Sequence, residues 1–267
     1  MGSLSAMRLF VLFHQDIHWE YYPEYLRDSL IFVNLSEHNV GKYSLPGVHA
    51  FDQASLPGFV SLGKWYAESE FLYNLSRNLS LFPNVEYVGF VHYDYDLSTL
   101  SQSDFETALS HCDVVSFETS DFEDDYRQNI MMDARFPNML QGGGKNCYQQ
   151  IVEDYNQHYH SKHTVAGLVG AEICLCSAFV MKTAVLQQMM AFIAPLIERG
   201  QLNAFDKGHR YRAQGGFLER YFGVWMVLQG VSMKNLEMPH RFQKSTPARA
   251  PLCSRIKYKI FKTLRVL

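Results

Sequence analysis

The chain contains 267 residues, 47% of them hydrophobic and 19% charged, with a net charge of −3. This balance is typical of a folded protein with a substantial core, and it excludes extended disorder. The five cysteines are odd in number and lack paired CxxC spacing, which indicates reduced thiols in a cytosolic setting rather than a disulfide framework or a zinc site. The apolar run at residues 9–13 is too short for a signal sequence or a membrane span, so we expect a cytoplasmic protein.

Charge is distributed unevenly along the chain. Eight of the 24 lysines and arginines follow Glu237, whereas all 27 acidic residues lie at or before it, so the residues up to Glu237 carry a net charge of −11. An acidic body lacks the basic face that nucleic-acid phosphates require, and we expect no nucleic-acid partner. The predicted organisation is one domain, residues 7–248, followed by a basic tail, residues 249–267.

Apolar patterns predict the elements of the first part of the chain. In chain order these are a buried strand at 7–13, a short strand at 32–35, a helix at 64–79 and a strand at 86–92. Residues 41–63 are rich in Gly, Pro and Ser and predict an irregular loop. The first strand ends directly at the polar residues His14 and Gln15, where strand ends of an open sheet carry binding groups.

The second part of the chain continues the alternation of strands and helices. The predicted elements are a helix at 103–111, a strand at 113–117, a helix at 147–160, a β-like run at 173–181, and helices at 184–197 and 217–228. Residues 141–145 (QGGGK) and 203–216 predict loops, and the first of these lacks the upstream glycine of a phosphate-binding P-loop. The alternation predicts a single α/β domain, a three-layer sandwich with a mainly parallel central sheet.

The most informative motif is YVGFVHYDYD at residues 87–96, an apolar run that ends in two carboxylates. Alternate residues of an extended chain face the same way, so Asp94 and Asp96 are expected to present oxygens to one hard cation at a strand end. A divalent cation held there can grip a diphosphate. The alternative is a solvated acidic turn.

Two blocks of the sequence resemble bacterial capsular and exopolysaccharide glycosyltransferases. The stretch WYAESEFLYNLSRN with YVGFVHYD is similar to that group's Y-x-E-x-x-x-L-Y and Y-V-G-x-x-H-Y motifs, and AEICLCSAFVMKTAVL with GGFLERYFGVWMV is similar to its downstream strand-helix and E-R helix. The resemblance covers residues 65–96 and 167–227. It implies a glycosyltransferase A fold, a nucleotide-sugar donor and a D-x-D metal motif. Many relatives have arginine where this chain has Asp94.

The resemblance and the strand-end rule together nominate donor and metal residues. Mn²⁺ or Mg²⁺ would be held by Asp94 and Asp96, with the late His240 completing the shell. Asp96 is expected to be the better ligand of the two acids, and the alternative for Asp94 is contact with the donor ribose. The donor-binding candidates are the groups expected near that ion: His14, Gln15, Glu68, His92 and Asp94. For the histidines, Gln15 and Glu68 the alternatives are ordinary structural or solvent-facing roles.

A transfer that inverts the sugar needs a base to deprotonate the acceptor hydroxyl. Glu219 is the first candidate, because GGFLER places it near a helix start and resembles the position of the acidic base in inverting enzymes of this fold. Asp121 and Glu172 are the reserves. The alternative for Glu219 is a surface helix without chemistry.

The predicted function is transfer of a sugar from a nucleotide donor, with UDP-sugars favoured, to a hydroxyl of a glycan or lipid-linked glycan. In the basic tail, apolar residues at helical spacing would let it lie on an anionic membrane surface, whereas the alternative is a solubilising tail. The competing functions are a non-catalytic sugar- or nucleotide-binding module and a membrane-docked scaffold.

Overall fold

The computed structural model describes residues 4–43, 45, 47–63, 66–126, 147–202 and 213–241. The predicted loop at 141–145, the predicted basic tail at 249–267 and most of the predicted loop at 203–216 lie outside these residues. The domain boundaries 7–248 therefore remain a prediction.

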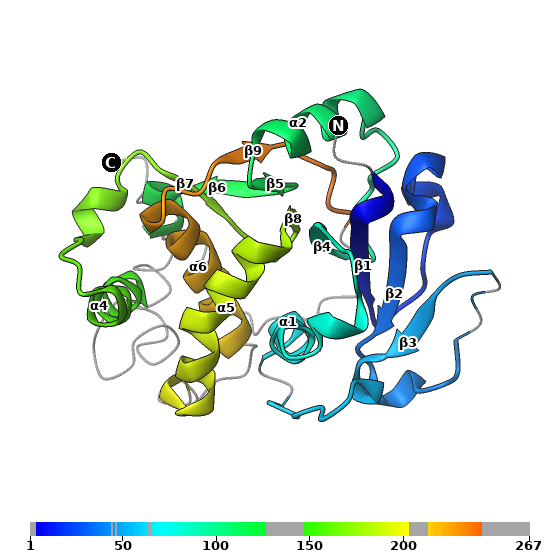
Figure 1. Cartoon of the computed structure of the whole chain (residues 1–267), viewed down its shortest axis with the longest axis horizontal. Helices are drawn as coiled ribbons and strands as arrows, with labels where there is room; N and C mark the ends of the chain where they lie inside the picture. The colour runs from blue at the N-terminus through cyan, green and yellow to red at the C-terminus, as the bar shows by residue number, and fades with distance from the viewer. Residues whose placement is uncertain are drawn as a thin grey trace, which may run out of the picture.

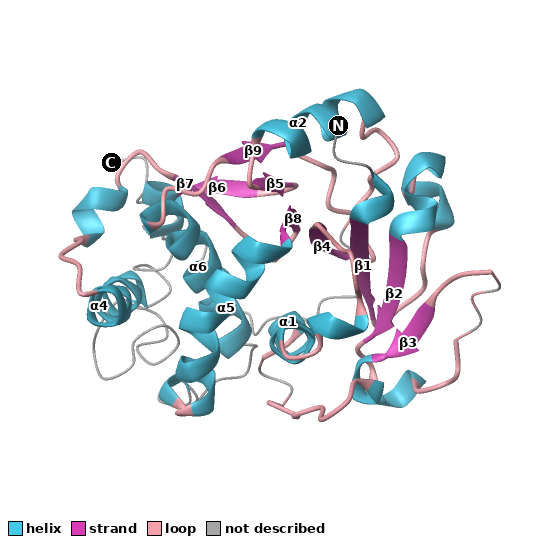
Figure 2. Cartoon of the chain, viewed as in Figure 1, coloured by secondary structure: helices cyan, strands magenta, loops and turns pink. Residues whose placement is uncertain are grey.

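A seven-stranded sheet crosses the molecule in the order β3-β2-β1-β4-β8-β5-β9 (Figures 1 and 2). Its strands are β1 (Met7–Phe13), β2 (Leu30–Asn34), β3 (Ala50–Asp52), β4 (Tyr87–His92), β5 (Val114–Ser116), β8 (Phe179–Lys182) and β9 (Met233–Asn235). Strand β8 runs antiparallel to both of its neighbours, and the other neighbouring pairs are parallel. The predicted α/β class with a mainly parallel sheet is confirmed.

Helices cover both faces of this sheet and complete the three layers. On one face lie α1 (Glu68–Ser76), α4 (Cys147–Tyr159), α5 (Thr183–Glu198) and α6 (Ala213–Leu228), and on the other lie α2 (Gln102–His111) and the 3-10 helices Trp19–Tyr21 and Glu24–Ser29. Further 3-10 helices are Leu4–Ala6, Glu37–Asn39, Gln53–Ser55, Leu79–Leu81 and Val165–Leu168. Strand β1 is buried on both sides, with Phe10 in one apolar core and Leu9 in the other.

A two-stranded antiparallel sheet, β6 (Thr119–Asp121) with β7 (Glu172–Cys174), stands beside the main sheet. The sequence predicted one β-like run at 173–181, but the run is broken into β7 and β8. The break lies at Cys176 and Ser177, whose φ angles of 57° and 48° are left-handed and end an extended strand. Strand β6 was not predicted.

Several predicted boundaries shift. Helix α1 starts at Glu68 because Ala67, with φ of 49°, interrupts the chain before it. Helix α6 starts at Ala213, so Gly215 and Gly216 lie inside its first turn rather than in a preceding loop. The predicted loop 41–63 contains the short strand β3, which pairs with β2. Strand β9, which pairs with β5, was not predicted.

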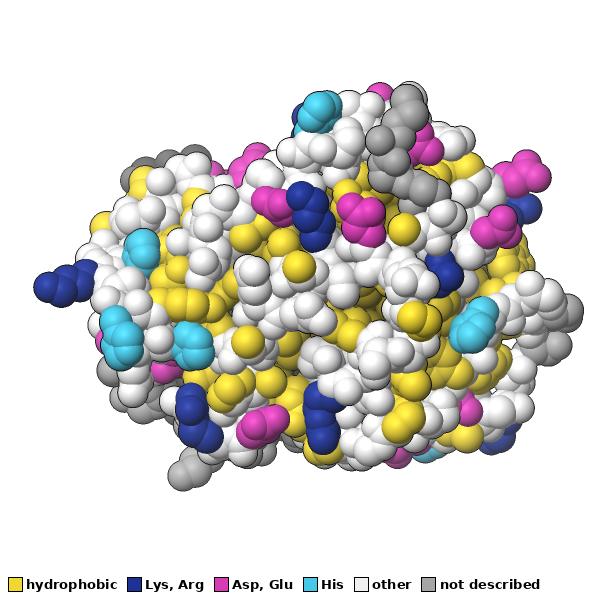
Figure 3. Space-filling view, viewed as in Figure 1, with side chains coloured by type: hydrophobic (Ala, Val, Ile, Leu, Met, Phe, Trp, Pro, Cys, Tyr) yellow, Lys and Arg dark blue, Asp and Glu magenta, His cyan; other side chains and the backbone are white. Residues whose placement is uncertain are grey.

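The described surface carries both signs of charge. On the face drawn in Figure 3, acidic and basic side chains are interspersed and no patch of one sign dominates. Among the described residues, no helix has both the length and the apolar character that crossing a membrane would require.

Gly89 at the centre of β4 gives a test of the packing that holds the site-bearing strand. A Cβ at this position would lie 2.6 Å from Val180 Cγ2 and 2.8 Å from Leu9 Cδ1. We expect Gly89→Ala to lower the free energy of unfolding by about 1–3 kcal/mol through overpacking, measured by urea denaturation. Gly167→Ala is the control, because its Cβ would meet nothing closer than Thr164 Oγ1 at 3.8 Å. Equal stability of the two variants would contradict this packing.

Candidate active site

A cavity of about 370 Å³ opens where β1 and β4 end. Parallel strands of an α/β sheet place binding groups at their carboxyl ends, and this is such an edge. Seven residues nominated from the sequence line the cavity: His14, Gln15, Glu68, His92, Asp94, Glu219 and His240. Residues separated by more than 200 positions thus meet in one place.

A tight turn after β4 positions Asp94. The strand ends at His92, and the Tyr95 amide donates to the His92 carbonyl at 3.1 Å. The Tyr93 amide donates to the carbonyl of Leu12 in β1 at 3.0 Å, which ties the turn to the neighbouring strand. Asp94 is therefore buried on the wall of the cavity next to the end of the sheet.

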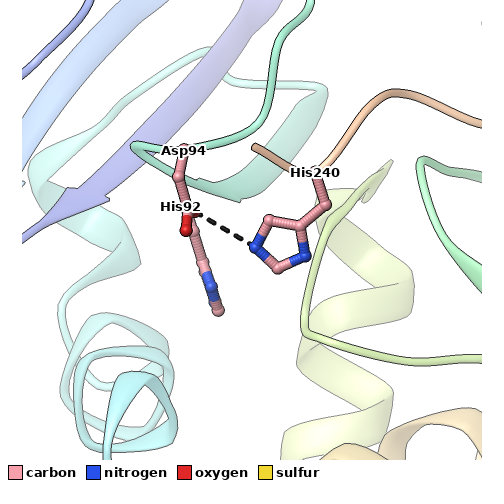
Figure 4. A group of neighbouring side chains, drawn as sticks. All are labelled: His92, Asp94 and His240. Atoms are coloured by element: carbon pink, nitrogen blue, oxygen red, sulfur yellow. Dashed lines mark ion pairs between the residues drawn. The ribbon is translucent and has the colours of Figure 1, made fainter. Parts of the chain in front are cut away.

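His240 reaches the cavity because its segment pairs with this turn. Tyr95 and His240 form an antiparallel β-bridge, and the Arg241 amide donates to the Asp94 carbonyl at 2.7 Å. The His240 ring stacks on the Tyr95 ring, with centroids 4.1 Å apart and planes inclined by 18°. Its Nε2 atom lies 3.2 Å from Asp94 Oδ1, and Figure 4 shows the two side chains turned toward each other.

Asp96 does not join this group, in contrast to the expectation that both acids share one face. Its Oδ1 accepts hydrogen bonds from the Ser98 amide at 3.1 Å and hydroxyl at 2.5 Å, and its Oδ2 lies 3.2 Å from an Arg241 guanidinium nitrogen. The alternation of an extended strand stops at His92, so residues two apart in the turn no longer point the same way. Asp96 is absent from the described lining of the cavity.

His92, Asp94 and His240 offer ligand atoms that all lie within 4.8 Å of one another. Two imidazoles and a carboxylate suit a transition-metal dication such as Mn²⁺ better than Mg²⁺, which prefers oxygen ligands. The donor set therefore fits the expected cation, with His92 in the place foreseen for Asp96.

Charge complementarity in this group shows in its pKa values. Burial opposes ionisation of Asp94, but the ion pair with His240 and the charge of His92 hold the pKa of Asp94 below the ordinary value. Burial likewise works against charging His240, yet the ion pairs with Asp94 and Glu118 raise its pKa to about 9. The carboxylate of Asp94 and the imidazole of His240 thus stabilise each other's charged form.

Glu118 and Cys176 complete the surroundings of His240 and were not nominated from the sequence. The carboxylate Oε2 of Glu118 lies 3.4 Å from His240 Nδ1 and accepts a hydrogen bond from the Tyr95 hydroxyl, and the Cys176 thiol donates to its Oε1 at 3.5 Å. Strands β6 and β7 bring the two residues together, because Glu118 precedes β6 and Cys176 follows β7. The sequence could have nominated Glu118, because it follows the predicted strand 113–117 just as Asp94 follows the predicted strand 86–92.

Helix α6 carries Glu219 into the cavity. Burial raises the pKa of Glu219 to about 7, and the negative charges of Glu68, Glu118 and Asp125 add to the effect against the opposing charge of Arg220. A carboxyl group with this pKa exchanges its proton readily near neutral pH. Glu219 lines the cavity and does not lie on an outward surface of the helix.

Arg220 fixes the start of this helix. Its guanidinium forms a bidentate ion pair with the buried Asp125, at 2.9 Å and 2.8 Å, and also donates to the Gly216 carbonyl at 2.8 Å. Asp125 in turn accepts a hydrogen bond from the Tyr148 hydroxyl of α4. The ion pair of Arg220 with Asp125 thus anchors helix α6 at the residue next to Glu219.

The starts of α6 and α1 pack closely at the cavity. A Cβ on Gly215 would lie 3.0 Å from the Tyr66 carbonyl oxygen and 3.3 Å from Ala67 Cβ. Ala67 holds a left-handed φ just before Glu68, and backbone strain of this kind concentrates at functional sites. A second cavity of about 480 Å³ shares His14, Ala67 and Glu68 with the first, so the two form neighbouring compartments.

The two reserve bases lie elsewhere. Asp121 is exposed at the end of β6, where its Oδ1 accepts hydrogen bonds from the amides of Glu123 and Asp124 at 2.9 Å and 3.2 Å. Glu172 faces it across the β6 and β7 pair and is also exposed. Neither residue is in the described lining of the cavity.

No protein-family model matches the chain, and no curated protein matches it by sequence. Among solved structures, it is similar to the apo structure of the bifunctional glycosyltransferase WbbM, with a TM-score of 0.51 and 13% identity, over 87% of this chain and 44% of that one. The chain has a glycosyltransferase A type fold. It spans less than half the length of WbbM. Core-mannan synthase A of Aspergillus fumigatus, in an Mn/GDP form, aligns over 87% of this chain and 73% of its own at 10% identity, with a TM-score of 0.35 that does not establish a shared fold.

The ion pair of Arg220 with Asp125 gives a test of how the site is held. We expect Arg220→Met to lower the free energy of unfolding by about 3–5 kcal/mol, because it leaves a buried carboxylate without its partner. Lys182→Met is the matched control: it breaks the Lys182 and Asp113 pair at 2.9 Å, whose side chains are 41% and 34% exposed. That loss should be about 0–1 kcal/mol. Similar losses in both variants, measured by urea denaturation, would contradict the assignment.

Proposed function

We propose that this protein is a metal-dependent glycosyltransferase that moves a sugar from a nucleoside diphosphate donor to a hydroxyl of a glycan acceptor. The observation that carries the proposal is the 370 Å³ cavity at the ends of β1 and β4, where His92, Asp94 and His240 converge and whose lining also includes Glu219. A glycosyltransferase A type fold supports it, since it is the scaffold on which such a site is expected.

The metal would be held by His92, Asp94 and His240, with Mn²⁺ favoured over Mg²⁺ by the two imidazoles. When bound, such a cation supplies positive charge that offsets the charge gathering on a departing diphosphate. Asp94 is ionised near neutral pH because its pKa is held below the ordinary value, so it can serve as a ligand without first losing a proton.

The donor would lie across the two neighbouring compartments. The larger compartment, of about 480 Å³, adjoins the metal-ligand group through His14, Ala67 and Glu68, and it has the volume for a nucleoside. His14 and Gln15 follow β1 and can hydrogen-bond a polar ligand at the junction. UDP-sugars and GDP-sugars are the donors to test, with UDP-sugars favoured.

Glu219 would take the proton of the acceptor hydroxyl as that oxygen attacks the sugar. Its pKa of about 7 leaves a substantial fraction ionised at neutral pH, and its conjugate acid is strong enough to release the proton again afterwards. Arg220 acts as a positioning residue, because it anchors the helix without lining the cavity.

The metal assignment predicts different outcomes for the two acids of the D-x-D motif. Asp94→Asn should weaken Mn²⁺ binding by about 100-fold or more, because it removes a charged ligand. Asp96→Asn should change it by less than about threefold, because Asp96 is held by Ser98 and Arg241 outside the group. Calorimetric titration of Mn²⁺ with UDP present measures both, and the reverse ranking would contradict the assignment.

The base assignment predicts a pH profile. Because Glu219 must be ionised to accept a proton, turnover should rise with pH through about 7 and level off above it. Glu219→Gln should lower kcat by about 10²–10⁴-fold and abolish this rise, while circular dichroism shows the fold retained. Turnover of UDP- or GDP-sugars by the wild-type protein, followed by mass spectrometry, is the readout. Donor binding without any transfer or hydrolysis would instead favour a non-catalytic binding module.

A further inference from the structure

His240 belongs to two groups of possible metal ligands that lie on opposite edges of its ring. Its Nε2 atom faces Asp94 at 3.2 Å, in the group with His92. Its Nδ1 atom faces Glu118 at 3.4 Å, in a group with Cys176. In each group the ligand atoms lie within 4.8 Å of one another.

A neutral imidazole has one lone pair and one N–H, so it can offer a lone pair on one edge at a time. If Nε2 holds a cation, the proton is on Nδ1 and can be donated to Glu118. If Nδ1 holds a cation, the proton is on Nε2 and can be donated to Asp94. In both arrangements a carboxylate lies beside the protonated nitrogen, Glu118 beside Nδ1 and Asp94 beside Nε2.

The group of Glu118, Cys176 and His240 has the ligand types of a site for zinc. One ligand atom from each residue lies within 4.8 Å of the other two. The Glu118 carboxylate contacts both partners, with Oε2 3.4 Å from His240 Nδ1 and Oε1 3.5 Å from Cys176 Sγ. A thiolate, an imidazole and a carboxylate together suit a soft or borderline cation rather than Mn²⁺ or Mg²⁺.

Backbone geometry supports a built site on the Cys176 side. Cys176 and Ser177 both hold left-handed φ angles, of 57° and 48°, which cost energy for residues with a Cβ. The Leu175 amide donates to the Glu118 carbonyl at 3.2 Å, which keeps the two segments in register. The Cys176 thiol, at the first residue of this strained pair, donates to Glu118 Oε1.

We propose that Glu118, Cys176 and His240 form a second cation site, selective for zinc-like ions, whose occupation excludes the ion held by His92, Asp94 and His240. The proposal rests on the proposed function in one respect, that the first group holds the working Mn²⁺. Zinc binding at the second group takes one proton from the Cys176 thiol, which becomes a thiolate, and one from the His240 imidazolium, and both protons go to solvent. The Nδ1 lone pair of His240 is then bound to zinc, the remaining proton is on Nε2, and no lone pair is left for the first group. Zinc therefore inhibits by competing for one shared ligand.

Cobalt(II) tests the site directly, because a bound thiolate gives a near-ultraviolet charge-transfer band that nitrogen and oxygen ligands do not give. Titrating the apo wild-type protein with Co²⁺ should produce this band, and Zn²⁺ should remove it by replacement. Cys176→Ser should lose the band, whereas the control Cys112→Ser, at a thiol that follows α2, should keep it. No band in wild type, or a band that survives Cys176→Ser, would overturn the proposal.

Two further arms complete the test. Glu118→Gln should weaken Co²⁺ binding by about 10-fold or more. It is a second variant that keeps the test decisive if Cys176→Ser does not fold. Asp94→Asn should keep the band, because the second group is intact.

In wild type, saturating Mn²⁺, whose binding is monitored by electron paramagnetic resonance, should suppress the cobalt charge-transfer band. Mn²⁺ and the full band present together would overturn exclusion, whereas a band in a protein that binds no Mn²⁺ would refute the proposed function and leave the thiolate site standing.

Discussion

The arrangement of the site depends on one imidazole held between two carboxylates. One nitrogen of His240 lies 3.2 Å from Asp94 and the other lies 3.4 Å from Glu118. The Tyr95 ring stacks on the His240 ring, and the Tyr95 hydroxyl donates a hydrogen bond to Glu118. The position and the charge of the ring are therefore set together, much as an outer carboxylate orients the ligand histidines of metal sites. If this histidine moved, the group of His92 and Asp94 would lose one of its three possible ligand atoms.

The fold supplies each partner of His240 from a different element. The turn after β4 places Asp94, the β6 and β7 pair places Glu118 and Cys176, and helix α6, anchored by Arg220, places Glu219. Because the central strands are buried on both faces, these groups gather at the sheet edge, where polar atoms can remain functional. Three possible metal ligands and a carboxylate whose pKa is about 7 thus line one cavity.

Much of this could be predicted from the sequence, because strong local patterns decide strands and strand ends. Strand β1 was predicted with its bounds. His14, His92 and Asp94 were nominated from their places at strand ends, and Glu219 from its place near a helix start together with the family resemblance, and all four line the cavity. Asp96 was misplaced because the period of two ends where the turn begins. The break at Cys176 and Ser177 and the pairing of β6 with β7 depend on tertiary contacts that local apolar patterns do not encode.

The proposed function requires a divalent cation to bind where His92, Asp94 and His240 converge. The most direct measurement is a crystal structure of the protein with Mn²⁺ and UDP, with anomalous scattering recorded at the manganese edge. We expect an anomalous peak within bonding distance of those three side chains and in contact with the diphosphate. A peak between Asp94 and Asp96 that does not touch His240, or a bound nucleotide with no metal beside it, would contradict it.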